Sequence, residues 1–366
     1  MKLATIAKYV DQPMILNKLD NKMPKLLVCA GGTLGVADSI NTAKKDKKNA
    51  KKKLVQNAII ISSTIGASLL GTRGLKIGNK KIFNGLMERV DFSKLQKMQT
   101  KAVDKFFDKV QVSDKEVLNA LNTAKVKELS PKQIDILTNK LPESPAKEEL
   151  FSVILPKKKN LNSKEIFSEI KRLSLLGLVP VVGGVGGGII ADRLTNPSKN
   201  EKSSTSAKKR IANKVKEGLY QYLANIFLCN VGAGTALFIS ERLEKAKKIK
   251  PLTPMKKLVV ILSGITATGI IGGSYIANYV SKRCIDPLFG EAKSKKLYSE
   301  RKPEALDIAL HADDIATAGI LSGFKWIEPA LPFMYFVSGY RAGIGYRNGK
   351  KDNEQDKKSS SLLTYT

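Results

Sequence analysis

The chain has 366 residues, enough for roughly two or three domains, so its length excludes no fold class. A formal net charge of +30 stands beside a hydrophobic content of 42%, and the two are separated along the chain into glycine-rich apolar runs and lysine-rich linkers, which disfavours a single soluble core. The three cysteines are Cys29, Cys229 and Cys284. They lie far apart and form no CxxC pair, so the sequence shows no recognisable disulfide framework or thiolate metal site.

Residues 1–71 are predicted to hold an N-terminal basic segment and the first two membrane segments. The run Leu54–Gly71 has the length and apolar character needed to cross a bilayer. The earlier run, Leu26–Ile40, is short and includes Asp38, so we expect a tilted span or a re-entrant segment there.

Residues 72–172 change to the pattern of a soluble helical insert. Two capping boxes are predicted to start helices, at Ser113–Glu116 and at Ser130–Gln133. The stretch Phe92–Val112 has one apolar face at helical spacing. Packing in a small helical bundle is the favoured interpretation of that face, and binding to a membrane surface is the alternative.

Residues 173–304 are predicted to hold three glycine-rich membrane segments joined by basic linkers. The runs are Leu173–Ala191, Leu219–Ile239 and Leu258–Val280, and none of them contains a charged residue. Each has about the 20 apolar residues that a transmembrane helix requires.

Residues 305–348 are predicted to form an amphipathic helix and a last membrane segment, Ile327–Ile344, with polar ends. Residues 349–366 are expected to be a disordered tail because they contain little apolar surface. The predicted fold is therefore all-α: a multi-pass transmembrane helical bundle of about six spans with a soluble helical insert.

The alternative to transmembrane helices is that the apolar runs are buried helices of a large soluble protein, because such helices are also apolar on every face. The glycine run Gly183–Gly188 argues against them. In an exposed helix each glycine costs about 1 kcal/mol relative to alanine. In a membrane, glycine lets two helix backbones approach closely.

Small residues four positions apart predict close helix packing, because such positions line one stripe of a helix. The pairs are Gly31/Gly35, Gly183/Gly187 and Gly269/Gly273, with Gly184/Gly188, Gly319/Gly323 and Gly339/Gly343. These stripes favour a compact bundle or a homo-oligomer. None continues into the Gly-Lys-Ser/Thr ending of a phosphate-binding loop.

One segment could hold a divalent metal or relay a proton. If it is helical, Asp307, His311 and Asp314 lie on one face. The favoured interpretation is that they form the polar face of an amphipathic helix at the membrane surface, because no further histidine or cysteine is near.

Ionisable residues at the ends of the predicted spans are a second group of interest. Charges deep in a bilayer usually mark a pathway or a paired contact. Asp38, Asp192, Glu328 and Arg341 lie near the edges, where they can also reach water. Asp38 is the most useful to test because its span is short.

Lysine clusters occur at residues 44–53, 208–210, 245–250 and 293–296. We expect them to contact the headgroups of anionic lipids in the bilayer. Nucleic acid is the disfavoured partner because the clusters lack interleaved aromatic residues. The basic linkers before Leu54, Leu219 and Leu258 do not define an orientation, since consecutive linkers lie on opposite sides.

The sequence contains no recognisable catalytic motif or dinucleotide fingerprint, so we expect no enzyme activity and no cofactor. The favoured function is a structural or scaffolding component of a plasma or inner membrane. The alternative is a small-solute or ion transporter. A second alternative is a soluble or peripheral basic protein that binds anionic lipid or nucleic acid.

Overall fold

A computed structural model describes residues 3–45, 50–77, 80–84, 92–155, 163–196, 201–289, 301 and 331–345. The chain divides into two compact units. Of the described residues, the first unit contains 3–25 and 92–155, and the second contains the remainder.

The first unit is a small helical bundle. Its elements are α1 (Leu3–Val10), the first part of α2 (Pro13–Lys45), α4 (Phe92–Lys109), α5 (Lys115–Val126), α6 (Pro131–Lys140) and α7 (Pro145–Ile154). Val103 and Phe106 of α4 are buried in one core with residues of α5, α6 and α7. The apolar face of α4 therefore packs inside this unit, as the favoured interpretation of the sequence predicts.

The N-terminal segment belongs to this unit through paired hydrogen bonds. The Gln12 side chain donates to the Leu129 carbonyl at 2.8 Å and accepts from the Leu129 amide at 2.7 Å. The predicted grouping of residues 1–25 with the first membrane segments misses this contact, because no local pattern indicates a partner 117 positions away.

One of the two predicted capping boxes is confirmed. Ser130 accepts from the Gln133 amide at 3.3 Å, and the Gln133 side chain accepts from the Ser130 amide at 2.9 Å. The box expected at Ser113 is wrong. Asp114 is the N-cap of α5 and accepts from the amides of Glu116 and Val117, so its carboxylate satisfies two donors at once.

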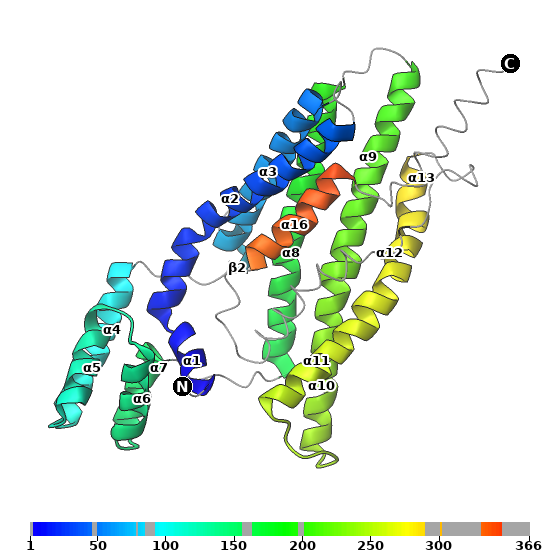
Figure 1. Ribbon diagram of the computed structural model, residues 1–366. Helices are drawn as coiled ribbons and strands as arrows, with labels where there is room; N and C mark the ends of the chain where they lie inside the picture. The colour runs from blue at the N-terminus through cyan, green and yellow to red at the C-terminus, as the bar shows by residue number, and fades with distance from the viewer. Residues whose placement is uncertain are drawn as a thin grey trace. The chain divides into compact units, whose positions relative to one another are not determined.

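The second unit contains the long apolar helices. Its elements are the remainder of α2, α3 (Ala50–Arg73), β1 (Gly74–Ile77), β2 (Lys80–Asn84), α8 (Ser163–Thr195), α9 (Glu201–Tyr222), η2 (Leu223–Phe227), α10 (Leu228–Lys245), α11 (Pro254–Ile265), η3 (Thr266–Gly273), α12 (Ser274–Val280), η4 (Ser281–Ile285), α13 (Asp286–Leu288) and α16 (Leu331–Ile344). The η segments are π-helical turns. Helix α8 packs against α3, α9, α10 and α16 (Figure 1).

A short antiparallel hairpin follows α3, so the all-α prediction misses one local feature. β1 pairs with β2, with Gly74 opposite Asn84 and Ile77 opposite Lys80, and the register shifts between Leu75 and Lys76. The rest of the described chain is helical or irregular.

Four helical stretches are long and apolar enough to cross a membrane. They are Ala50–Gly71, Glu165–Thr195, Ala207–Lys245 and Lys256–Leu288. Each contains one of the four strongest runs in the sequence. The weaker run Leu26–Ile40 lies in α2, which does not qualify among the described residues, and only the part of Ile327–Ile344 from Leu331 onward is described.

Candidate functional site

Helix α8 presents two adjacent glycine stripes to two neighbours. Gly183 and Gly187 face α3: a Cβ built on Gly183 would overlap the Ala67 side chain, and one on Gly187 would lie 2.6 Å from the Ser63 Cβ. Each is closer than a real Cβ contact, so no larger side chain fits without movement.

The second stripe faces α16. A Cβ on Gly184 would overlap the carbonyl oxygen of Gly339, and one on Gly188 would overlap that of Gly343. The two backbones are thus in direct contact, with glycine on both sides of the interface. Neighbouring helix positions are about 100° apart around the axis, so one glycine run can serve two helices.

The other predicted pairs also lie against neighbouring helices. Gly31 lies beside Ile61 and Phe336, and Gly35 beside Ile61. Gly269 lies against Cys229, and a Cβ on Gly273 would be 2.9 Å from the Ala224 Cα. The effect of these glycines on stability is still a prediction. The pair Gly319/Gly323 lies outside the described residues.

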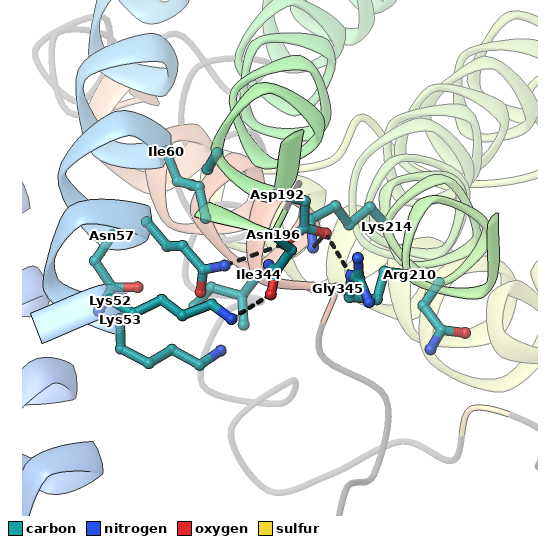
Figure 2. A pocket seen from close by; sticks show the side chains of 13 residues that line it. Lys52, Lys53, Asn57, Ile60, Asp192, Asn196, Arg210, Lys214, Ile344 and Gly345 are labelled. Carbon is teal, nitrogen blue, oxygen red and sulfur yellow. Dashed lines mark hydrogen bonds and ion pairs between the residues drawn. The ribbon is translucent and has the colours of Figure 1, made fainter. Parts of the chain in front are cut away.

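A basic pocket of about 340 Å³ lies in the second unit (Figure 2). Its charged lining consists of Lys52, Lys53, Arg210, Lys214 and Asp192. The remaining lining residues are Gln56, Asn57, Ile60, Ala191, Asn196, Asn213, Ile344 and Gly345.

Four helices contribute residues to the pocket. Lys52 and Lys53 lie in the first turn of α3, Asp192 in the last turn of α8, and Arg210 in the N-terminal half of α9, while α16 ends at Ile344. The basic clusters at residues 44–53 and 208–210, which from sequence do not define an orientation, therefore both contribute to one end of the bundle.

A third basic cluster, 245–250, follows the far end of α10. Helices α9, η2 and α10 run consecutively from Glu201 to Lys245. At 1.5 Å per residue, Lys245 is about 50 Å along this rod from Arg210. The first two clusters and the third thus belong to opposite ends of the unit.

Asp192 is the centre of the polar contacts in the pocket. Its carboxylate is 2.9 Å from the Lys214 Nζ and 3.6 Å from the Arg210 Nε, and it accepts from the Gln56 Nε2 at 3.2 Å. Figure 2 shows the Arg210 and Lys214 side chains directed toward it. Both Asp192 and Lys214 are almost fully buried, at 10% and 8% side-chain exposure.

The α3 side of the pocket is held to the end of α8. Lys52 Nζ donates to Asn196 Oδ1, and Gln56 Nε2 donates to the Thr195 hydroxyl at 2.7 Å. The lining contains four cationic side chains and one carboxylate, so its net charge is +3.

Asp38 forms a separate polar junction. Its carboxylate accepts from the Asn57 Nδ2 at 3.1 Å and from the Tyr340 hydroxyl at 3.2 Å. Asn57 also donates to the Ser39 hydroxyl at 3.1 Å. Asp38 therefore links α2 to α3 and α16. Of the other predicted edge charges, Arg341 is buried in α16 at 6% exposure.

Several predicted site residues lie outside the described residues. These are Glu328 and the proposed metal ligands Asp307, His311 and Asp314. Within the described ranges, no group of three or more His, Cys, Asp and Glu side chains is arranged to hold a metal ion.

A buried polar ladder that runs from α9 into η2 is not among the residues predicted from sequence. Gln221 donates to Glu217 at 2.9 Å, Asn225 donates to Gln221 at 2.9 Å, and Arg301 Nε is 3.3 Å from the Glu217 carboxylate. Glu217 and Arg301 have no exposed side-chain surface. The Arg301 guanidinium also lies over the Tyr220 ring, 4.8 Å from its centroid.

The sequence does contain a signal for this ladder. The predicted run begins at Leu219, two residues after Glu217, so this prediction leaves the carboxylate in the linker. The spacing of Glu217, Gln221 and Asn225 is i, i+4 and i+8, which places all three on one face of a helix.

Comparison with known proteins adds no relative. No protein-family model, no curated protein and no solved structure matches this chain.

Proposed function

We propose that this chain is a multi-pass integral membrane protein that acts as a structural scaffold. In this proposal the second unit is embedded in the bilayer, and the first unit is a water-facing helical module. The four long apolar helices support the membrane location.

The observation that carries the proposal is the exposure of large apolar side chains on those helices. Val259, Ile271 and Tyr275 are 61%, 72% and 75% exposed in the folded chain. Helices that are apolar because they fill a soluble core would have these side chains covered. All three lie on the stretch Lys256–Leu288, and large apolar side chains exposed on a helix of this length fit contact with lipid.

The scaffold role is supported by the close helix packing of the second unit and by the separate core of the first. Helix α8 contacts α3 and α16 through backbone-close glycine stripes, which suit a fixed bundle. The first unit has its own core, with Lys147 buried and donating to the carbonyls of Thr138 and Leu141 at the end of α6. A helical module with its own core is suited to present a binding surface.

Extraction of membranes tests the location. The full chain should stay in the membrane pellet after a high-salt wash and an alkaline carbonate wash. Attachment by lysines alone would be lost in salt, because such contacts are screened within about 8 Å at physiological ionic strength. Release of most of the protein into the supernatant would overturn the proposal.

A small-solute or ion carrier is the second candidate, and the Glu217–Arg301 pair favours it. Ionisable residues inside an apolar span often line a transport pathway. Purified chain in proteoliposomes should show no solute-dependent or ion-dependent flux if the scaffold proposal is right. Flux that is present in the wild type and lost in Asp38→Asn would replace the scaffold with a carrier.

A further inference from the structure

We propose that the basic pocket formed by Lys52, Lys53, Arg210 and Lys214 binds a phosphate group, carried by an anionic lipid headgroup or by a free phosphate compound. The proposal deepens the membrane function, and only its lipid source rests on that function. The pocket itself is a property of the second unit alone.

The pocket concentrates positive charge. Lys52 and Lys53 approach from α3, and Arg210 and Lys214 from α9, so the cations form two walls of one cavity. Arg210 and Lys214 are also one helical turn apart, a spacing at which like charges destabilise a helix. Asp192 offsets part of that repulsion, and an anion in the pocket would offset more.

The net positive charge of the lining and its number of donors favour a phosphate over a simple carboxylate. The four cationic side chains and the single carboxylate leave the lining with a net charge of +3. A phosphate monoester brings between one and two negative charges and several acceptor oxygens, so it matches both the charge and the number of donors. Arginine and lysine are the usual donors to such oxygens, through charge-assisted hydrogen bonds.

The walls are held in place before any ligand enters. Asp192 positions Lys214 and Arg210 from one side, and Asn196 at the end of α8 accepts from Lys52. Lys53 is exposed at the pocket and is the wall residue with the most freedom to reach a ligand. A pocket of about 340 Å³ has room for a phosphate and the group that carries it.

The position of the pocket fits a lipid source. The apolar stretches Ala50–Gly71 and Ala207–Lys245 begin beside it, and Glu165–Thr195 ends there. In a membrane, helix ends lie at the level of the lipid headgroups.

An apolar groove adjoins the pocket. It lies between α2 and α3, has a volume of about 540 Å³, and is lined by Leu54, Ala58 and Ile61 among others. Asn57 lines both the groove and the basic pocket. A lipid whose phosphate occupies the pocket would have an apolar surface nearby for an acyl chain.

The test compares two double variants of the full chain, purified in detergent, that carry the same change in charge. The pocket variant is Lys53→Gln with Arg210→Gln. The control is Lys51→Gln with Lys208→Gln, because these lysines are neighbours on the same helices, are exposed, and do not line the pocket. The probes are inorganic phosphate and vesicles of phosphatidylcholine with or without phosphatidic acid.

We expect the wild type and the control to bind at least one probe with equal affinity, and the pocket variant to bind it about tenfold more weakly. Binding to phosphatidic acid alone identifies a lipid source, and binding to inorganic phosphate as well identifies a free compound. The proposal is overturned if the wild type binds neither probe, or if the two double variants lose affinity equally. Because the affinity is measured in detergent and vesicles, these outcomes are independent of the carbonate wash.

Discussion

Gly184 of α8 and Gly339 of α16 are in direct backbone contact, because a Cβ on Gly184 would overlap the Gly339 carbonyl oxygen. The space for a single methyl group is therefore missing at this point. Two positions along the same helix, Gly186 has no atom within 4 Å of such a Cβ. This pair gives a test in which the substitution is identical and only the surroundings differ.

Gly184→Ala should lower the thermal stability of the purified chain in detergent, since overpacking a close interface costs about 1 to 3 kcal/mol. Gly186→Ala should leave stability unchanged or raise it, because alanine is the better helix former. The measurement is the melting temperature of each variant. Equal melting temperatures would contradict the close contact between α8 and α16.

Leucine is a more disruptive substitution, and it tests Gly187 in the stripe toward α3 and Gly273 in η3. Gly187→Leu should displace α3 at Ser63, and Gly273→Leu should displace η2 at Ala224. Either change should reduce the melting temperature or dissociate an oligomer in size-exclusion chromatography. Ile261→Leu, a swap of similar volume at a buried position, should do little. If both glycine variants behave like this control, the glycines do not mediate helix contacts.

The Glu217–Arg301 pair should be sensitive to the loss of one partner. Glu217→Gln leaves the buried Arg301 guanidinium without its carboxylate, which costs about 3 kcal/mol or more. Glu241→Gln is the matched control, because its partner Lys245 is 69% exposed and such surface pairs contribute little. Chemical unfolding of both variants measures the difference, and a loss no larger than that of the control would show that the pair is not a structural contact.

Asp192→Asn combines a structural and a ligand effect. The variant should be less stable than the wild type, because Lys214 is buried and loses its carboxylate partner. It should also bind phosphate more tightly, because an internal competitor for Arg210 and Lys214 is gone. Added phosphate should therefore raise the melting temperature of the variant more than that of the wild type. A smaller rise in the variant would contradict competition at this site.

The cap of α5 should depend on pH. The Lys140 ammonium, together with the Glu116 amide, holds the pKa of the Asp114 carboxyl below its ordinary value of 3.8. Because the pKa is lower in the folded state, the stabilisation is fully present above that ordinary value and is lost as the pH falls through the folded one. Hydrogen exchange at Glu116 and Val117 should report this loss on acidification.

The control for that experiment is Asp114→Asn, which keeps a side-chain acceptor at the N-cap but cannot be protonated in this range. Amide protection at the start of α5 should then change little between neutral and acidic solution. The role of the carboxylate would be refuted by equal acid sensitivity in the variant and the wild type.

Local sequence patterns predict the helices and caps that depend on interactions between residues close together in the chain. The Ser130 box was readable because its two hydrogen bonds join residues three positions apart, and the four strongest apolar runs appear in the structure as helices long enough to cross a membrane. The cap at Asp114 was misplaced by one residue because serine and aspartate stand side by side and both favour the N-cap position.

The candidate site was predictable only in part. Lys52, Lys53 and Arg210 belong to lysine-rich clusters that were already expected to contact anions. The joining of those clusters depends on tertiary contacts such as Lys52 with Asn196, 144 positions apart, and these leave no local pattern. Arg301 could not be paired with Glu217 for the same reason, since 84 positions separate them.

The paired stripes on α8 make the helix sensitive to a shift of one residue, and the sensitivity differs by direction. Deleting one residue just before Gly183 would bring Gly184 and Gly188 to face α3, while Val185 and Ile189 would be forced against α16. Inserting one residue there would keep glycine toward α16, because Gly183 and Gly187 would take the places of Gly184 and Gly188. The inserted residue would then face α3 in the place of Gly183. A single-codon deletion in this stretch should therefore detach α16 and spare α3, whereas a single-codon insertion should mainly disturb α3.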